Sequence, residues 1–333
     1  MKSWFDLPEN KQIEIFEQVG MKEGLPSSAI EKDWWVSLTL NVVFSLPFSN
    51  ALLFKGGTSL SKSWNLIERF SEDIDLAVDM QYLGFSGDIS GTQVNKLRKV
   101  SCKFIKEDFF VRLLERAKEY GIRFDNIFIP ETADSDKDPL TIEIQYKSIT
   151  EKSDYILPKV LIEISARSLK EPFKVVSVQS LVGKNFNDGE FSDKPIEIPT
   201  VLPKRTFLEK VFLLHEEFQK PKEKIRVDRL SRHLYDLEKM MDTEHGVEAL
   251  NDVALYKTIV LHRERFNFIK GLNYKNHQPD KIDFVPPAFV IKEWEEDYKI
   301  MQENMIYGES LSFKSLIERM KELKYRFRKI MQN

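Results

Sequence analysis

A glycine pair after a short apolar run, followed by two aspartates one residue apart, constrains this chain more than any other feature. The glycines are Gly56 and Gly57, after the apolar run 51–54, and the aspartates are Asp73 and Asp75. Because side chains alternate between the faces of a strand, the two carboxylates are expected on one face, roughly 7 Å apart. Such carboxylates can bind one divalent ion, or a pair of ions about 3.5–4 Å apart as in phosphoryl and nucleotidyl transfer. The segment therefore predicts a nucleotide and metal site.

The glycines and the two hydroxyl residues after them predict where phosphate binds. Without Cβ atoms, the backbone N–H groups of Gly56 and Gly57 can approach phosphate oxygens closely. The hydroxyls of Thr58 and Ser59 follow where a helix N-terminus favours an anion. An Asp-x-Asp pair alone is a weak signal, because it is also common at strand ends that face water. The ordered combination of strand, glycine turn, helix-compatible segment and second strand is far more specific.

The same segment resembles a known family. Gly-Gly-Thr-Ser-Leu at 56–60 and Arg-x-Ser-x-Asp-Ile-Asp-Leu at 69–76 resemble the nucleotidyltransferase superfamily signature, and in detail that of AbiEii/AbiGii-type toxins. The gap between the two motifs is longer than in the general superfamily pattern and is similar to that of the toxin branch. The resemblance implies that six motif residues contribute to nucleotide binding. They are Gly56, Gly57, Thr58, Ser59, Arg69 and Ser71.

Composition limits the cellular setting. A chain of 333 residues with 42% hydrophobic content can hold two domains with buried cores. The single cysteine, Cys102, cannot form an intramolecular disulfide, so we expect a reducing compartment and a small buried side chain. Residues 1–10 lack the apolar core of a signal peptide, and the tract 34–48 is shorter than the roughly 20 residues of a membrane span. We therefore expect a cytoplasmic protein with no membrane partner.

The first part of the chain predicts an α/β core. Helical periodicity is found at 7–19, 28–46 and 92–120, the second of these with a capping box of Ser28 and Glu31. Strand-like segments lie at 123–129, 140–146 and 159–165, and the loop 130–139 is acidic and predicted to be solvated. The resemblance implies a nucleotidyltransferase-like catalytic domain over 1–200, with a mixed β-sheet flanked by helices. It also allows Lys32 and Asp33 to line the cleft, against the alternative of a solvated charge cluster.

A third acid is expected beside the two aspartates. Nucleotidyl transfer needs a carboxylate on a neighbouring strand to bind the ion and accept the proton of the attacking hydroxyl. Glu143 and Glu163 each lie among apolar, β-branched neighbours, so either could serve or could simply face solvent. We prefer Glu163, because the residues around it are more similar to the family.

The second part, 201–333, predicts a mostly helical domain that begins after the proline-bounded stretch 199–203. Amphipathic helices are expected at 204–218 and 228–241, and a final helix at 312–331. Lys210 is semi-buried by pattern. The second helix aligns four polar residues on one stripe, which by pattern alone favours an exposed, salt-bridged surface. They are Arg229, Arg232, His233 and Asp236.

The resemblance gives these helices a role in closing the active-site cleft. Glu-Lys at 209–210 and Arg-x-x-Arg-x-x-x-Asp-Leu at 229–237 are similar to toxin-family motifs. Lys210 is thereby expected to neutralise triphosphate charge, and Asp236 to orient Lys210 or to hold Arg232, which itself binds nucleotide. His233 is expected to be a packed or capping residue rather than a general base.

A basic run at 220–232 supplies six cations that could contact a phosphate backbone. The net charge of the whole chain is only −3, and such runs are usually solvated loops. The resemblance implies a toxin of a toxin–antitoxin or phage abortive-infection system, with a cognate antitoxin protein as partner. Its substrates would be an NTP and RNA, most notably the 3′ end of tRNA, with Mg²⁺, or Mn²⁺ in its place, held by Asp73, Asp75 and Glu163.

Three alternatives stay open. The same chemistry could modify a protein or a small molecule such as an antibiotic, and the basic run would then be incidental. Asp-x-Asp also occurs in glycosyltransferases and in phosphatases, but the phosphatase pattern expects Thr where this chain has Ala77, and neither class explains the glycine pair. A non-catalytic binding module with this fold is disfavoured by the intact aspartates.

Overall fold

The computed structural model describes residues 4–71, 73–87, 89–122, 124–131, 138–151, 155–166, 172–187, 189–266 and 268–329. The chain forms two compact units. The first is the sheet unit, made of Met1–Ser63 and Phe70–Val201, and the second is the helical unit, made of Trp64–Arg69 and Leu202–Asn333. The division thus falls inside the proline-bounded stretch at 199–203. It also assigns the short segment Trp64–Arg69 to the helical unit, which the sequence prediction did not do.

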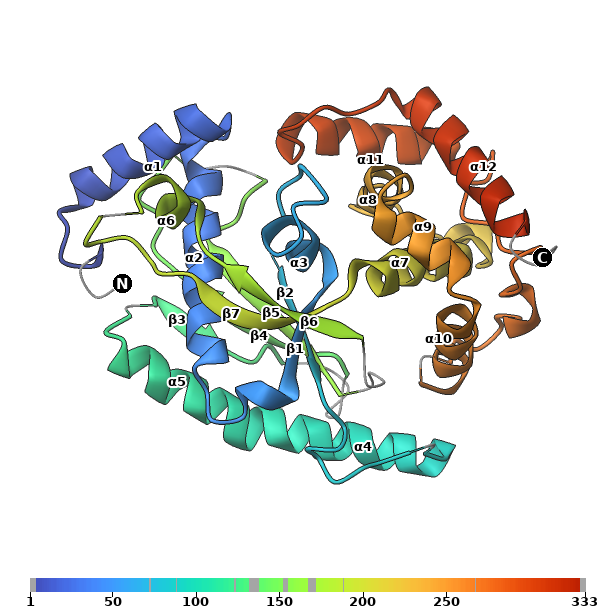
Figure 1. The fold of residues 1–333 in the computed structure, drawn as a ribbon, viewed down its shortest axis with the longest axis horizontal. Helices are drawn as coiled ribbons and strands as arrows, with labels where there is room; N and C mark the ends of the chain where they lie inside the picture. The colour runs from blue at the N-terminus through green and yellow to red at the C-terminus, as the bar shows by residue number, and fades with distance from the viewer. Residues whose placement is uncertain are drawn as a thin grey trace. The chain divides into compact units, whose positions relative to one another are not determined.

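The sheet unit is built on a mixed sheet, which the described residues form from seven strands in the order β3-β4-β5-β2-β1-β7-β6 (Figure 1). Strand β2 lies at the centre, antiparallel to β1 and parallel to β5. A mixed sheet with flanking helices confirms the predicted α/β class. The strands are β1 (Leu52–Lys55), β2 (Asp73–Val78), β3 (Asn126–Phe128), β4 (Leu140–Gln145), β5 (Lys159–Ser165), β6 (Phe173–Val178) and β7 (Ile196–Val201).

Helix α2 (Ser27–Phe44) is the core helix of the sheet unit. It packs on β2 and β5 and is contacted by α1, α5 and α6. Its residues are buried on nearly every side, and because its later part is apolar all round, that part can only be stable inside a core. The prediction of a core helix in this region is confirmed. The shorter helices around it are α1 (Glu9–Glu23), α3 (Gly56–Lys62), α6 (Leu181–Asn185) and a 3₁₀ turn at Ser49–Ala51.

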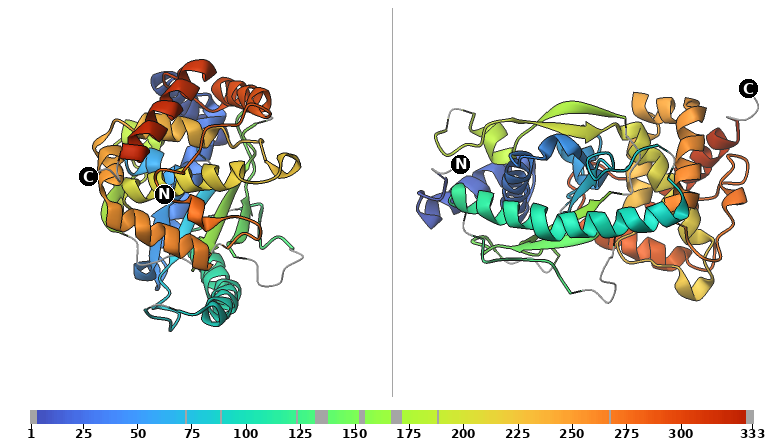
Figure 2. Two further views of the ribbon diagram at one scale, coloured as in Figure 1. Left: turned by 90° about the vertical axis from the view of Figure 1, so that its right-hand side faces the viewer. Right: turned by 90° about the horizontal axis from the view of Figure 1, so that it is seen from below.

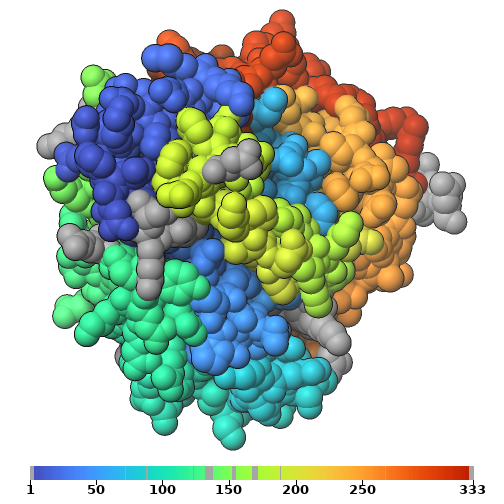
Figure 3. All heavy atoms as spheres, turned by 60° about the vertical axis from the view of Figure 1, so that its left-hand side comes forward, coloured from blue at the N-terminus to red at the C-terminus, as the bar shows by residue number. Residues whose placement is uncertain are grey.

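The predicted long helix at 92–120 is present, with a π-helical segment in its middle. Helix α4 (Gly91–Phe104), the π segment (Ile105–Phe109) and α5 (Phe110–Glu119) form one continuous rod (Figure 2). Cys102 is buried in it, as predicted. Helices α1 and α5 both reach the surface of the sheet unit (Figure 3), where α5 carries ion pairs one turn apart.

Strands β6 and β7 have no counterpart in the sequence prediction. Strand β6 lies at the edge of the sheet and its first three residues are exposed, so it lacks the alternation of a half-buried strand. Strand β7 contains Pro199, a residue that normally argues against a strand interior. Of the acidic loop predicted at 130–139, Asp134 and Asp136 lie outside the described residues.

The capping box predicted at the start of α2 is wrong. The helix begins at Ser27, and no side chain caps it. The Glu31 carboxylate instead accepts hydrogen bonds from the Ser148 hydroxyl at 2.7 Å and from the Ile149 N–H at 3.0 Å. Glu31 therefore anchors the segment after β4, because a buried carboxylate needs donors that water cannot supply.

Lys32 and Asp33 also bind loops of the sheet unit. The Lys32 ammonium donates to the carbonyl oxygen of Leu157 at 2.9 Å. Asp33 accepts from the Leu181 N–H at 2.7 Å and forms a buried ion pair with Lys62. Both residues are buried, so they are not the solvated charge cluster, and their predicted place at the cleft stays a prediction.

The helical unit is organised around α7 (Pro203–Phe218), which packs against α8, α9 and α10. Phe207, Val211 and Leu214 are buried on it, as the amphipathic pattern predicts, and so are Lys210 and Glu217. The other helices are α8 (Arg232–Met240), α9 (Glu244–Asn251), α10 (Val253–Phe266), α11 (Ile291–Asn304) and α12 (Phe313–Lys329), with 3₁₀ turns at Lys222–Lys224 and Tyr274–Asn276.

Helix α8 begins four residues later than the pattern predicts. The carboxylate of Asp297 on α11 accepts the N–H of Arg229 at 2.6 Å and the N–H of Ser231 at 2.9 Å. Arg229 has a φ of 58°, in the left-handed region that a non-glycine residue seldom adopts. Asp297 thus stabilises a turn at Arg229, and the turn delays the helix until Arg232.

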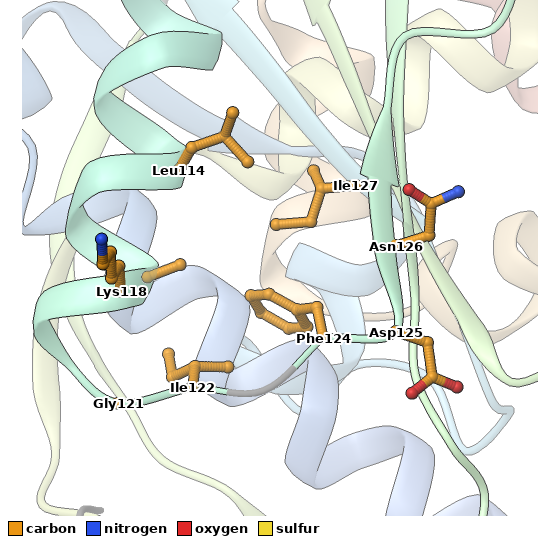
Figure 4. Close-up of a pocket in the computed structure, with 9 residues that line it drawn as sticks. Leu114, Lys118, Gly121, Ile122, Phe124, Asp125, Asn126 and Ile127 are labelled. Atoms are coloured by element: carbon orange, nitrogen blue, oxygen red, sulfur yellow. The ribbon is translucent and has the colours of Figure 1, made fainter.

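Two pockets lie apart from the predicted site residues. One, of about 550 Å³, lies in the sheet unit between the end of α5 and β3, where Leu114, Phe124 and Ile127 point toward one another (Figure 4). The other, of about 420 Å³, lies in the helical unit and is lined in part by His215 and Phe218. No predicted site residue lines either of them. Within the described part of the chain, each helix is too short or too polar to traverse a lipid bilayer.

Candidate active site

Gly56 lies directly against the carboxylate of Asp75. Helix α3 starts at Gly56, immediately after Lys55, and Lys55 pairs with Asp75 across the antiparallel strands β1 and β2. Gly56 has a φ of 77°, and a Cβ atom on it would lie 2.7 Å from Cγ of Asp75 and closer still to Oδ2. Glycine is therefore required here twice over, for its backbone conformation and for the space that the carboxylate occupies.

The hydroxyls of Thr58 and Ser59 point inward. Thr58 donates to the Asp73 carbonyl oxygen, and its Oγ1 lies 3.0 Å from Oγ of Ser71. Ser59 donates to the Gly56 carbonyl oxygen at 2.9 Å, and both residues are buried. Thr58 thus joins the glycine turn to the start of β2, and Ser59 closes the turn on itself. A phosphate contact at this turn would accordingly use backbone N–H groups, since the first N–H groups of a helix have no partner within it.

Asp73, Asp75 and Glu163 lie on one face of the sheet. Asp73 and Asp75 are half-buried and alternate with the buried Ile74. Glu163 on β5 is the direct partner of Asp75 in the parallel pair, so the two side chains leave the sheet on the same side. The register therefore brings together the three acids that the sequence selected.

Glu143 is one strand further away. It lies on β4 opposite Leu161, and β5 separates β4 from β2. Burial raises the pKa of Glu143, but hydrogen bonds from Gln145 at 2.8 Å and Lys159 at 3.1 Å outweigh it, and the pKa is lowered. Glu143 is thus engaged by its own neighbours, and the register favours Glu163 as the third acid.

The second group of predicted residues forms a buried ionic cluster inside the helical unit. The Asp236 carboxylate lies 2.6 Å from Nε of Arg69 and 2.7 Å from Nζ of Lys210. A second nitrogen of the same guanidinium donates to Oδ2 of Asp236 at 2.7 Å, so the Arg69 contact is bidentate. The exposed fractions of the side chains are 0% for Asp236, 2% for Arg69 and 7% for Lys210. One carboxylate thus serves two cations out of contact with bulk water.

Burial and neighbouring charges shift the pKa values of Asp236 and Lys210 in this cluster. Burial raises the pKa of Asp236, yet Arg69 and Lys210 lower it by more, and the carboxyl stays ionised. Burial lowers the pKa of Lys210, and the nearby Arg69 lowers it further, while Asp236 opposes both. The ammonium of Lys210 consequently loses its proton more readily than an ordinary lysine.

Arg69 is the member of this cluster that sequence reasoning missed. The pattern assigned Asp236 to Lys210 or Arg232, and the structure pairs it with Lys210 and Arg69. Arg69 reaches Asp236 because its segment is bound within the helical unit, where the Glu68 carbonyl oxygen accepts the N–H of Tyr307 at 3.0 Å. The predicted contact of Arg69 with nucleotide stays a prediction.

The basic run is partly neutralised by a carboxylate of the preceding helix α7. The buried carboxylate of Glu217 lies 2.7 Å from Nζ of Lys220 and accepts from the guanidinium of Arg226 at 2.7 Å. Lys222 lies 5.8 Å from the centre of the exposed ring of Phe289. The exposed charge of the run is therefore smaller than the sequence suggests, and it is accompanied by an aromatic side chain.

The sequence profile of one protein family, described as "Nucleotidyl transferase AbiEii toxin, Type IV TA system", matches residues 43–333. The chain belongs to the AbiEii family. It is accordingly a nucleotidyltransferase of a type IV toxin–antitoxin system, which confirms the predicted family and enzyme class and implies a nucleotide substrate and an antitoxin. The predicted metal-binding, nucleotide-binding and catalytic residues lie inside the matched region, whereas Lys32 and Asp33 precede it.

Among solved structures, this AbiEii protein is similar to JHP933 from Helicobacter pylori, with 15% sequence identity and a TM-score of 0.41 over 89% of this chain and 91% of that chain. It is also similar to a second H. pylori structure, described provisionally as a nucleotidyltransferase. Here the identity is 16% and the TM-score 0.38 over 89% of this chain and 92% of that chain. No curated protein matches the AbiEii chain.

Proposed function

We propose that this AbiEii protein is a metal-dependent enzyme that transfers a nucleotide from an NTP to RNA, at the 3′ end of tRNA. The observation that carries the proposal is the pairing of Asp75 with Glu163 beside Gly56. This arrangement gathers acidic oxygens next to a turn whose first helical N–H groups have no partner within the helix. Carboxylates for a divalent ion and N–H groups for phosphate are the two needs of nucleotidyl transfer.

The acidic face of the sheet, formed by Asp73, Asp75 and Glu163, suits Mg²⁺ that binds together with the substrate. Mg²⁺ prefers oxygen ligands and is usually held by one or two carboxylates, water and substrate phosphates rather than by an all-protein cage. The described residues contain no group of three or more His, Cys, Asp or Glu side chains placed to hold a metal ion by themselves, so oxygens of the substrate or of water would have to complete the site. When bound, the ion would offset charge on the attacking and leaving oxygens. Asp73, Asp75 and Glu163 would supply its protein ligands.

The protein's own groups would bind and orient the NTP and deprotonate the acceptor hydroxyl. The backbone at Gly56 and Gly57 would hold phosphate oxygens, with Ser71 and Thr58 keeping the turn fixed to β2. A carboxylate of the acidic face would accept the proton of the acceptor hydroxyl as its oxygen attacks the α-phosphorus and pyrophosphate departs. From the family resemblance, Lys210 and Arg232 would offset triphosphate charge, and Asp236 would orient Lys210.

RNA is the acceptor that the chain's surface supports best. Lys222 and Lys224 are exposed in the basic run, and Lys222 lies over the exposed ring of Phe289. Cations interleaved with aromatic rings suit a phosphate backbone with accessible bases. The family resemblance points to the tRNA 3′ end, and NTP and tRNA would place the reaction in the cytoplasm. Transfer to a protein or a small molecule is the alternative.

The test is incorporation of label from each α-³²P-labelled NTP into total tRNA with Mg²⁺. We expect label at tRNA 3′ ends, loss of label on chelation with EDTA, and loss in the Asp75→Asn variant. Label that appears only in a protein or a small molecule would overturn the acceptor, and transfer that survives EDTA would overturn metal dependence. Equal toxicity of wild type and Asp75→Asn in cells would overturn the enzymatic basis of toxicity.

A further inference from the structure

His233 lies beside the buried lysine of the ionic cluster. Its Nδ1 is 3.4 Å from Nζ of Lys210, and Oδ2 of Asp236 is 2.7 Å from the same Nζ. His233 and Asp236 are three residues apart on α8, so both face one side of that helix. A lysine ammonium has three N–H donors. Asp236 accepts one of them, Nδ1 of His233 is placed to accept a second, and the third can serve a ligand.

Asp236 alone cannot fix the direction of Lys210. Its carboxylate already holds the Arg69 guanidinium through both oxygens, so Lys210 shares an acceptor with another cation. A lysine bound to one shared oxygen can still rotate about that contact, because its side chain is long and flexible. A second acceptor removes this freedom, and Nδ1 of His233 is placed to provide it.

The surroundings of His233 determine its protonation state. It is buried, and the charged groups around it are the cations Lys210, Arg232 and Arg69 and the anion Asp236. Burial and the neighbouring cations lower the pKa of His233 well below its ordinary value, so the ring is neutral at pH 7. A neutral imidazole has one acceptor nitrogen. Only the tautomer with hydrogen on Nε2 leaves Nδ1 free to accept from a lysine ammonium.

We propose that His233 is a positioning residue for nucleotide transfer, and that as the neutral Nε2–H tautomer it accepts a hydrogen bond from the Lys210 ammonium and aims the remaining N–H at the nucleotide. The aiming rests on the proposed function, whereas the hydrogen bond and the tautomer do not. This role differs from general base catalysis, because His233 acts only through Lys210.

The first test is NMR of the full-length protein with ¹⁵N-labelled histidine. Long-range ¹H–¹⁵N correlation at pH 7 distinguishes the two neutral tautomers from the imidazolium, and the His233→Asn spectrum assigns the signal. We expect His233 as the Nε2–H tautomer. An Nδ1–H tautomer or an imidazolium at pH 7 would overturn the proposal, whatever the enzyme's activity.

The second test compares His233→Asn with His233→Leu. The Asn Oδ1 lies near the position of Nδ1 and can accept from Lys210, whereas Leu has a similar volume and no acceptor. We expect His233→Leu to lower kcat about 10-fold or more with little change in the KM for NTP, because misaligned groups lose rate rather than affinity. His233→Asn is expected to retain kcat within about 3-fold, in line with a conserved acceptor.

Two measurements complete the comparison. Thermal unfolding shows whether both variants remain folded. The matched control for the loss of a histidine from the helical unit is His245→Leu, which lies outside the ionic cluster. Equal kcat for the Asn and Leu variants would contradict a positioning role. If wild type transfers no nucleotide at all, the proposed function fails, and the tautomer measurement still decides whether His233 accepts from Lys210.

Discussion

Asp75 on β2 and Glu163 on β5 are directly paired across two parallel strands at the centre of the sheet. Lys55, the other neighbour of Asp75, ends β1 and is followed at once by Gly56. Three adjacent strands therefore place two carboxylates, a cation and a glycine turn on neighbouring positions of one sheet. Because the pairing is set by backbone hydrogen bonds, their relative positions are held by the core rather than by flexible loops.

Replacing Glu163 by Gln should abolish transfer with little effect on folding. The amide keeps the shape of the side chain but removes the charge that binds a metal ion and the basicity that accepts a proton. We expect nucleotide incorporation to fall by about 10²-fold or more. Glu143→Gln on the same face is the matched control and should stay within about 3-fold of wild type, because β5 separates it from Asp75. A larger loss in Glu143→Gln than in Glu163→Gln would reverse the choice of third acid.

Replacing Gly56 by Ala should displace the Asp75 carboxylate. The new Cβ would overlap that group, so the turn or the side chain must move, and we expect at least about 10²-fold lower transfer. Gly24→Ala is a matched control, because Gly24 has a φ of 70° and no atom within 4 Å of the added Cβ. It should cost about 1–2 kcal/mol of unfolding free energy for its backbone conformation and leave activity intact. Full activity of Gly56→Ala in a steady-state assay would show that Asp75 is not held as described.

Periodicity and local motifs could predict Asp73, Asp75 and the glycine turn, because their geometry depends on neighbours in the sequence. Periodicity could not separate Glu163 from Glu143, and the preference for Glu163 came from the family resemblance. Both lie in strands of the same apolar pattern, and the geometric distinction between them is the order of β4, β5 and β2. The pair of Arg69 and Asp236 was likewise out of reach, since 167 positions separate the two residues.

Other differences arise where tertiary contacts override a local signal. Glu31 fits a capping box by spacing, but the buried donors of Ser148 and Ile149 take its carboxylate. The stripe of Arg229 and Asp236 reads as an exposed helix face. In the structure Asp297 holds Arg229 in a turn, and Asp236 is buried between cations. Local pattern therefore located these polar residues but could not assign their partners.

Replacing Asp236 by Asn should destabilise the helical unit strongly. The variant leaves the Arg69 guanidinium and the Lys210 ammonium buried without their shared carboxylate, and breaking a buried pair in this way costs about 3–5 kcal/mol. Asp242→Asn is the control. Asp242 is mostly exposed and pairs with Arg319 and Arg326, so its loss should cost below about 1 kcal/mol. Urea unfolding measures both, and equal costs would show that burial of the Asp236 cluster contributes nothing.

His215 should make the protein less stable in mild acid. It is buried in the helical unit, where its Nδ1 lies 3.0 Å from the N–H of Asp283 and its Nε2 2.9 Å from the Gln219 amide nitrogen. Burial lowers the pKa of His215 from 6.5 to about 4. Between these pH values the unfolded chain takes up a proton that the folded protein does not. The contribution of His215 to the free energy of unfolding is therefore fully present above pH 6.5 and is lost as the pH drops toward 4.

The loss over this window is on the order of 3 kcal/mol. His215→Gln removes the titrating group, so its unfolding free energy should depend less on pH than that of wild type. Because every other titrating residue is common to the two proteins, the difference between their urea unfolding free energies at pH 7 and pH 4.5 isolates His215. Parallel curves for wild type and variant would mean that the folded and unfolded states bind the His215 proton equally, and that its burial has no energetic consequence.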